Sequence, residues 1–467
     1  MKLLVVGGGI TGLAAAWEAV RTTADEPIEV TLVESSDRLG GKLHTERRDG
    51  LLIEHGPDSF VAYRPAALTL IEELGLSDQV ISVSGARSVS LRARGRLRPL
   101  PAGMGMVLPT RLGPFVTTGI LSVGDKLRAG LDLFLPRQLS DGTDVTIGGF
   151  LRARLGGGIV RRFADPMVGG IYGASVDELS LDAVLPSLRA DEKAHRSLML
   201  ASLAAGRRAR SAGPRGANSP FRTLRGGLGS LVDALGEQLR AAGAELRTGV
   251  TVTHLAAVNG RAEATFSDGT AADFDAVVLA AGVQSCASLL SEAAPEATQA
   301  LREIPLATST VVSLAYAADA FAEPPTTHGW LEADSAPISG ITVSSAKWAD
   351  RAPDGVVLIR AFVPGRLGPI ADAPDEELSS AVCEHIAAVL SISQPPQEVS
   401  ISRWPQVMPK YTVGHLGRVA TVEKALADLP RWRVAGSSLR GVGVPDCVAD
   451  GRRQMAAALA AAQQTES

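Results

Sequence analysis

A glycine-rich turn between an apolar run and a helix-forming stretch constrains this chain more than any other feature. Residues 3–6 are apolar, the sequence GGGITG follows at residues 7–12, and helix-forming residues continue to about residue 22. A second apolar run ends in Glu34, 22 residues after Gly12. Strand, tight turn, helix, strand and terminal acid form the fingerprint of a dinucleotide-binding unit. The fingerprint alone is compatible with either NAD or FAD.

Each part of the fingerprint has a physical role. Gly7 permits a tight turn, Gly9 lets the backbone approach a pyrophosphate, and Gly12 lets the helix pack on the strand. The helix N-terminus offers free N–H groups and a positive dipole end to the phosphate. Glu34 can accept hydrogen bonds from ribose hydroxyls, and its charge repels a 2′-phosphate.

The composition excludes several classes of protein. The 467 residues amount to about three domains, with 45% hydrophobic and 21% charged residues, as in globular proteins. A net charge of −4 argues against a general nucleic-acid binder. Cys286, Cys383 and Cys447 have no C-x-x-C spacing, so neither a zinc site nor a disulfide framework is expected. With no leader sequence and no apolar run of about 18 residues, we expect a cytoplasmic protein without transmembrane helices.

The residues after Glu34 favour FAD over NAD. The sequence ESSDRLGGK at residues 34–42 places a second glycine pair just beyond the ribose-binding acid. This E-x-x-x-R-x-G-G pattern resembles an extension found in flavoproteins of the amine oxidase and desaturase superfamily. The resemblance implies that Gly40 and Gly41 bring the backbone close to FAD and that Arg38 or Lys42 offsets phosphate charge.

Distant segments complete an FAD site of this type. Residues 246–255 alternate as a strand, with Val252 where relatives pack on adenine, and residues 275–282 read as a buried strand ending in small residues. Residues 432–436 form another short strand, and the following helix, to about residue 462, has an N-terminus suited to stabilising negative charge on the reduced ring. The remaining residues that the resemblance implies for non-covalent FAD binding are Ile10, Thr11, Ser35, Gly56, Pro57, Asp58, Ser59, Ala281, Gly282, Gly436, Gly443 and Val444.

We therefore expect an α/β fold whose Rossmann-like FAD-binding domain is assembled from separated segments. Residues 1–84, 216–284 and 401–467 would form the FAD-binding domain, 85–215 a mainly helical domain, and 285–400 a mixed α+β substrate domain. Strand-like runs at 309–316 and 355–363 and a helix at 374–390 mark the substrate domain. Four arginines among Gly, Pro and Ser in residues 206–219 indicate a solvated loop: Arg207, Arg208, Arg210 and Arg215.

Motifs outside the fingerprint resemble the bacterial porphyrinogen oxidases of haem biosynthesis, which include protoporphyrinogen oxidases and coproporphyrinogen III oxidases. The motifs are GIYGA and ELS at 170–180, HRS at 195–197, RGGL at 225–228, YTVGH at 411–415 and GVGVPDC at 441–447. The resemblance implies a six-electron oxidation of a porphyrinogen in three two-electron steps, with oxygen as acceptor and hydrogen peroxide as product. The cofactor carries this chemistry, so no catalytic acid or base is assigned.

The expected substrate is coproporphyrinogen III, with protoporphyrinogen IX as the alternative. Residues 345–360 resemble the branch found in Gram-positive bacteria, which is associated with coproporphyrin formation. Coproporphyrinogen III keeps four propionates, and arginines can meet extra carboxylates through charge-assisted hydrogen bonds. Five arginines lie in the predicted helical domain: Arg87, Arg92, Arg94, Arg96 and Arg98.

The resemblance also implies residues that contact the substrate. Gly170 aligns with a glycine whose backbone lies against the macrocycle, and Leu331 aligns with an apolar residue on the pyrrole plane. Ile359 or Phe362 would line the opposite side. His328 would either assist proton release or serve as a structural histidine.

The implied partners beyond the substrate are oxygen and, as a candidate, a ferrochelatase or another haem-pathway enzyme. The apolar segment 103–121 is interrupted by Pro109 and Pro114, so we expect at most weak peripheral contact with the inner face of a membrane. The alternative for this segment is a wall of the substrate channel.

Two other classes share the expected FAD domain. An amine oxidase or carotenoid-type desaturase is the first, although four tyrosines make an aromatic cage of the amine oxidase type hard to build. The second is a binding protein that has lost the flavin. The intact glycines and the complete C-terminal motif argue against this second class.

Overall fold

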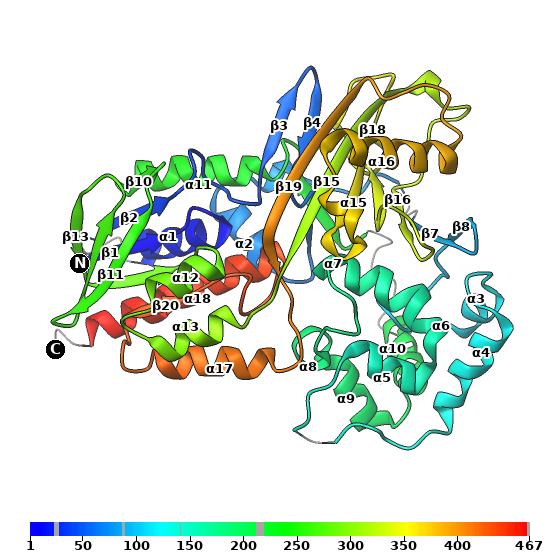
Figure 1. The fold of residues 1–467 in the computed structure, drawn as a ribbon, viewed down its shortest axis with the longest axis horizontal. Coiled ribbons are helices and arrows are strands. Elements are labelled where there is room, and N and C mark those ends of the chain that lie inside the picture. Colours follow the sequence, from blue (N-terminus) through cyan, green and yellow to red (C-terminus); the bar gives the residue numbers. More distant parts are fainter. Residues whose placement is uncertain (23–27, 86–88, 141, 212–218, 465–467) are drawn as a thin grey trace. The chain divides into compact units, whose positions relative to one another are not determined.

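The computed structural model describes residues 1–22, 28–85, 89–140, 142–211 and 219–464, and these form two compact units (Figure 1). Unit 1 comprises Met1–Ser82, Pro220–Ile304 and Gly417–Ser467, and unit 2 comprises Val83–Ser219 and Pro305–Leu416. Unit 1 is thus assembled from three separated segments of the chain. The predicted helical and substrate domains form one unit.

Unit 1 is built on a five-stranded sheet in which all neighbouring strands run parallel. Its strands, in spatial order, are β10 (Glu245–Thr248), β2 (Glu29–Glu34), β1 (Lys2–Val6), β14 (Ala276–Leu279) and β20 (Trp432–Val434). The chain passes through them as βαβ crossovers and inserted segments, which is the doubly wound arrangement that the sequence predicts.

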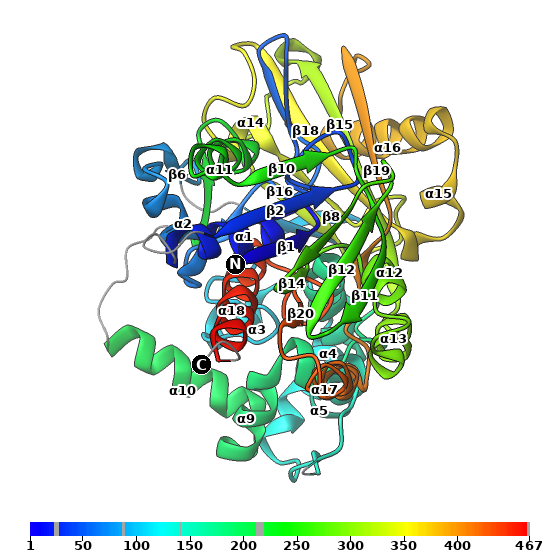
Figure 2. The same ribbon diagram turned by 90° about the vertical axis from the view of Figure 1, so that its left-hand side faces the viewer.

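Both faces of this sheet are covered. Leu3 and Val5 lie in one apolar core with α1 (Ile10–Thr22), α11 (Gly229–Ala241) and α18 (Val444–Gln463), and Figure 2 shows α1 and α18 beside the sheet. Successive residues of a strand point to opposite faces, so the buried Leu4 faces the other side. There a meander contacts β1 and β14. The meander strands are β11 (Val252–Val258), β12 (Arg261–Phe266) and β13 (Ala271–Phe274).

Smaller elements complete unit 1. The helices are α2 (Ala66–Glu73), α12 (Val283–Leu289), α13 (Pro295–Arg302) and most of α17 (His415–Ala425). The short strands are β3 (Thr45–Arg48), β4 (Leu51–Glu54), β5 (Phe60–Val61), β6 (Val80–Ser82) and β9 (Phe221–Leu224).

Unit 2 contains a seven-stranded sheet, one face of which packs on α16 (Asp375–Leu390). Its strands, in spatial order, are β19 (Glu398–Pro409), β15 (Leu306–Ala317), β18 (Val356–Pro364), β17 (Gly340–Val343), β16 (Gly329–Glu332), β7 (Val89–Ala93) and β8 (Arg96–Pro99). Two further short helices are α14 (Ser344–Lys347) and α15 (Pro369–Asp372).

The rest of unit 2 is helical. A ten-residue π-helix (Val160–Gly169) contains Pro166 and leads directly into α7. The α-helices are α3 (Leu112–Thr117), α4 (Val123–Gly130), α5 (Ile147–Leu155), α6 (Gly157–Ile159), α7 (Gly170–Tyr172), α8 (Leu181–Val184), α9 (Pro186–His195) and α10 (Leu198–Ser211).

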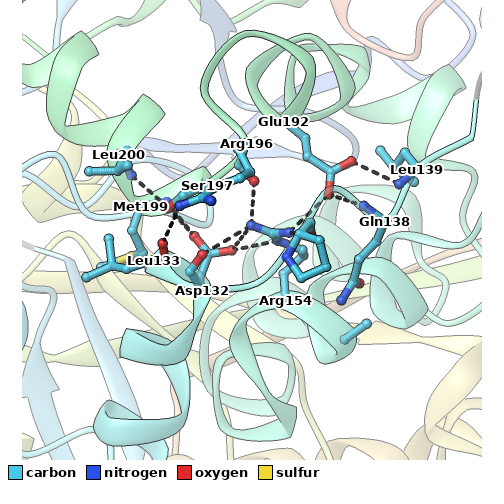
Figure 3. A network of polar contacts seen from close by, with 12 residues as sticks. Asp132, Leu133, Gln138, Leu139, Arg154, Glu192, Arg196, Ser197, Met199 and Leu200 are labelled. Atoms are coloured by element: carbon cyan, nitrogen blue, oxygen red, sulfur yellow. Dashed lines mark hydrogen bonds and ion pairs between the residues drawn. The ribbon is translucent and has the colours of Figure 1, made fainter.

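A buried ion network holds the helical region together (Figure 3). The guanidinium of Arg154 lies 2.6 Å from a carboxylate oxygen of Asp132 and 3.3 Å from one of Glu192. Asp132 also accepts hydrogen bonds from the Ser197 hydroxyl and the Met199 amide. The HRS motif at 195–197 therefore has a structural role, because its serine joins α9 and α10 to this network.

Several expected assignments along the chain differ from the structure. The predicted helical domain includes a β-hairpin, β7–β8, because β7 pairs with a strand more than 200 residues away, β16. Residues 401–416 belong to unit 2, because 401–409 continue β19 along β15. Residues 285–304, expected in the substrate domain, belong to unit 1, where they form most of α12 and all of α13. The strand expected at 246–255 is two strands, β10 and β11, separated by Gly249 at φ +70°.

Within the described ranges, none of the helices combines the length and apolar character needed to cross a bilayer. Much of the apolar segment 103–121 is core, since Val107, Phe115 and Ile120 are buried. Among the same described residues, no three His, Cys, Asp or Glu side chains gather as a metal site requires. Arg87, Arg215 and the side chain of Arg210 lie outside the described residues.

Candidate cofactor and substrate sites

The carboxyl ends of the parallel strands in unit 1 bring the expected cofactor residues to one edge of the sheet. Gly7 follows β1, Glu34 ends β2, Ala281 follows β14 and Gly436 follows β20. In open parallel sheets, ligands bind at this edge. Residues from all three segments of unit 1 therefore meet where a dinucleotide is expected.

The glycine turn fits a cofactor that approaches the backbone. A Cβ atom on Gly12 would lie 1.9 Å from the carbonyl oxygen of Gly7, so helix and turn require glycine there. A Cβ on Gly9 would meet no protein atom within 4 Å, and Gly9 is not in the left-handed region. The protein itself does not need glycine at position 9, whereas a pyrophosphate lying against the backbone does.

Glu34 is held at the rim of this turn. Its carboxylate accepts hydrogen bonds from the Gly8 amide at 2.7 Å and from the Ser36 amide at 2.9 Å. The hydroxyl of Ser35 also approaches the same carboxylate, at 3.4 Å. The hydroxyl of Ser36 donates to it as well, at 2.8 Å, and these donors together fix the orientation of the carboxylate.

Arg38 and Lys42 have different roles in the second glycine turn. The Arg38 guanidinium donates to the carbonyl of Gly41 at 2.8 Å, which shapes the turn. The Lys42 ammonium lies 3.3 Å from the hydroxyl of Ser437, in the third segment of unit 1, and burial lowers its pKa. Arg38 is thus engaged in shaping the turn, whereas the half-buried Lys42 reaches the third segment of unit 1, so Lys42 is the residue that we expect to offset phosphate charge.

The other expected cofactor residues lie in the same region of unit 1. Gly40 donates its amide to the carbonyl of Gly8, and a Cβ on Gly56 would lie 1.9 Å from the carbonyl oxygen of Lys42. Val252 is buried at the start of β11, and Gly443 caps the N-terminus of α18. The remaining expected residues are Ile10, Thr11, Pro57, Asp58, Ser59, Gly282 and Val444.

Asp450, which the sequence did not suggest, supports the third cofactor segment from behind. It is 2% exposed on α18 and accepts a hydrogen bond from the Gly436 amide at 2.8 Å. Its carboxylate also contacts Arg440 at 3.3 Å and Arg453 at 2.6 Å. Arg440 in turn donates to the carbonyl of Val434, the last residue of β20. Asp450 therefore fixes the turn from β20 into the C-terminal motif.

We predict that Asp450→Asn weakens FAD binding about tenfold, because the turn at Gly436 loses a charged anchor worth on the order of 1.5–3 kcal/mol. The measurement is FAD affinity by titration of apoprotein. The matched control is Asp132→Asn, which alters a buried ion network in unit 2 and should leave FAD affinity unchanged. Equal FAD affinity in Asp450→Asn and wild type would show that this aspartate serves stability alone.

Unit 2 brings two of the expected substrate residues onto one face of its sheet. Leu331 on β16 pairs with Gly340 on β17, and Gly340 pairs with Phe362 on β18. Residues in cross-strand register share a face, so two half-buried apolar side chains flank a glycine. We call this row of residues the Leu331–Phe362 shelf; Leu331 also packs against the helical core of unit 2, and the guanidinium of Arg360 lies over the Phe362 ring.

Ile359 and His328 lie elsewhere. Ile359 and Phe362 are three residues apart on β18, so their side chains point to opposite faces of the sheet. Ile359 is fully buried in the core that packs on α16. Ile359 was thus the wrong alternative for a lining residue. His328 is buried, and its Nε2–H donates to the carbonyl of Ser84 at 2.9 Å. This contact favours the structural role over proton release.

Gly170 stands at the junction between the π-helix and α7. It is exposed, and a Cβ there would meet no protein atom within 4 Å. As at Gly9, packing within the chain does not account for glycine. π-Helical turns occur disproportionately at functional sites, where they alter the path of a helix.

The arginines of the β7–β8 hairpin do not form one cluster. Arg92 pairs with the buried carboxylate of Glu332 at 3.5 Å, and Arg98 donates to the carbonyl of Ala93. Arg94 and Arg96 are exposed at the hairpin turn. The expectation that these side chains jointly meet propionates is not supported by their placement.

Comparison with known proteins agrees with this geometry. Residues 10–459 match the family of flavin-containing amine oxidoreductases, and the chain belongs to that family. It is an FAD-dependent oxidoreductase.

Individual relatives are more specific. The chain is 59% identical to a coproporphyrinogen III oxidase of Propionibacterium freudenreichii, over 96% of this chain and 89% of that protein. It is 33% identical to a coproporphyrinogen III oxidase of Bacillus subtilis, over 98% and 97%. The structure is also similar to a crystal structure from Exiguobacterium sp. 255-15 whose name is that of a protoporphyrinogen oxidase. The two chains align over 99% of each, with a TM-score of 0.85 and 30% sequence identity.

Proposed function

We propose that this enzyme oxidises coproporphyrinogen III to coproporphyrin III, with oxygen as electron acceptor and hydrogen peroxide as second product. The observation that carries the proposal is the 59% identity, over 96% of the chain, to a protein named for that activity. The full-length likeness to the Bacillus subtilis protein of the same name supports it. The glycine turn and acid of unit 1 supply the cofactor site that such a reaction needs.

FAD, when bound, supplies a two-electron acceptor for hydride. The chain's part is to hold that cofactor, and the proposed holders are the turn at Gly9, the acid Glu34, the ammonium of Lys42 and the turn at Gly436. These holders come from the first and the third segments of unit 1, so the bound cofactor would also tie these two segments together. A ligand that binds the folded chain alone raises its stability.

The Leu331–Phe362 shelf is the proposed surface for the substrate ring. A glycine between two apolar residues on one face leaves room for a broad macrocycle, whose burial is favoured by the hydrophobic effect, and the Arg360 guanidinium beside Phe362 could meet a carboxylate of the substrate. Gly170 is the proposed second contact, because its open surroundings admit a ring against the backbone. Oxidation releases protons from pyrrole N–H groups, and with His328 bonded to Ser84 we assign no side chain as the base.

The proposed location is the cytoplasm, with at most weak contact at the inner face of a membrane. Exposed apolar residues do occur on α3 and α4, among them Val116, Val123 and Leu127. They are spread over two short helices, which limits the area that could enter a bilayer interface. Flotation of most of the protein with lipid vesicles at physiological salt would overturn this part of the proposal.

Substrate preference tests the proposal against its nearest alternative, protoporphyrinogen IX. We expect kcat/KM for coproporphyrinogen III to exceed that for protoporphyrinogen IX, because this ratio measures discrimination even when both substrates react. The assay follows porphyrin fluorescence with both substrates at matched salt and detergent. A ratio of about tenfold or more in favour of protoporphyrinogen IX would reassign the substrate.

A further inference from the structure

A hollow of about 290 Å³ lies in unit 1. It is enclosed by the end of α17, the strand β20 and the middle of α18, which Figure 2 shows close together. One wall is apolar and is formed by Val422, Leu426, Ala427, Pro430 and Val434. The rest of the lining is polar or charged and comprises Glu423, Arg433, Arg440 and Gln454.

Arg433 is the unusual member of this lining. It is half-buried, and its guanidinium donates to the carbonyl of the adjacent Trp432 at 3.0 Å. Within the described part of the chain, no carboxylate forms an ion pair with it. Burial lowers the pKa of its guanidinium, and the nearby positive charge of Arg440 adds to this effect. Both causes indicate that the charged form lacks compensation here.

The charges around the hollow do not balance. Arg440 pairs with Glu423 at 2.6 Å and with Asp450 at 3.3 Å, and Arg453 shares Asp450 at 2.6 Å. Arg453 is 60% exposed and does not line the hollow, so among the described residues the lining guanidinium without a carboxylate partner is that of Arg433. One positive charge is therefore left over beside a partly desolvated hollow. A bound monoanion would neutralise this charge, whereas a dianion would leave the site with a net negative charge.

We propose that this hollow binds a small monocarboxylate with a short apolar chain. The planar guanidinium of Arg433 suits a carboxylate, which it can meet through two parallel hydrogen bonds. The wall from Val422 to Val434 then covers the apolar end of the ligand. All residues that line the hollow belong to unit 1, whereas the proposed substrate shelf belongs to unit 2.

Butyrate binding to the FAD-loaded protein, measured by isothermal titration calorimetry, tests the proposal. We expect saturable binding to wild type and at least tenfold weaker binding to Arg433→Met, which keeps the apolar stem and removes the charge. Arg431→Met is the matched control, because Arg431 lies two residues away and donates to the carbonyl of Gly260. This variant should bind butyrate as wild type does.

Several outcomes would overturn the proposal. These are butyrate binding undiminished in Arg433→Met, uncharged butyramide binding as tightly as butyrate, inorganic phosphate binding as tightly as butyrate, or no saturable binding to wild type. The same carboxylate chemistry could come from a free acid or from a propionate arm of a porphyrin. Loss of butyrate binding in the presence of coproporphyrin III would assign the hollow to the porphyrin arm, and unchanged binding would assign it to free acids.

Discussion

Purified Gly9→Val is expected to carry no FAD and to have no oxidase activity. No steric contact within the protein requires glycine at position 9, since a Cβ there would meet no protein atom within 4 Å. The valine side chain would instead occupy the space proposed for the pyrophosphate, next to the N-terminus of α1. The measurement is the ratio of flavin to protein absorbance after purification.

The control for Gly9→Val is the same substitution at Gly417. A Cβ on Gly417, in α17 of unit 1, also meets no protein atom within 4 Å, but this helix supplies none of the proposed cofactor residues. Gly417→Val should retain one FAD per chain. Stoichiometric FAD in Gly9→Val would refute the assignment of this turn.

Asp132→Ala is expected to lower the free energy of unfolding of unit 2 by about 3–5 kcal/mol, because it breaks a fully buried ion pair and leaves the Arg154 charge with less compensation. The Ser197 hydroxyl and the Met199 amide lose their acceptor as well. Urea unfolding followed by circular dichroism measures the change.

Asp177→Ala provides the comparison for Asp132→Ala. Asp177 pairs with Arg152 at 2.8 Å, but both side chains are 50% exposed, so its loss should cost no more than about 1 kcal/mol. Equal effects of the two substitutions would mean that burial does not set the strength of the network in Figure 3.

The parts of the fold that the sequence predicted are those with contiguous signals. The turn from Gly7 to Gly12, the following helix and Glu34 lie within one short stretch, and the structure has strand, turn, helix and strand there. The three-segment assembly of unit 1 was predictable for a different reason. It followed from a family resemblance that extends along the whole chain, not from local patterns.

The parts that the sequence did not predict depend on distant partners. The β7–β8 hairpin contains Arg92, Arg94, Arg96 and Arg98, which read locally as a charged run, and its strands exist because β7 pairs with β16. Asp450 is one acidic residue in a long helix, and its role depends on the Gly436 amide and Arg440. Because Ile359 and Phe362 are three residues apart, the sequence could have predicted that their side chains point to opposite faces of the strand. It could not predict which face carries the Leu331–Phe362 shelf, because that depends on the neighbouring strands.

The proposal that this enzyme oxidises coproporphyrinogen III with oxygen is best tested by the electron balance of the FAD-loaded enzyme with that substrate. Six electrons leave each porphyrinogen, so we expect three oxygen molecules to be consumed and three hydrogen peroxide molecules to be formed per coproporphyrin III. Oxygen uptake, peroxide and porphyrin absorbance would be recorded on the same sample, with the FAD-free protein as the blank. The proposed reaction would be contradicted if porphyrin formed no faster than in that blank. It would also be contradicted if porphyrin formed without matching oxygen uptake.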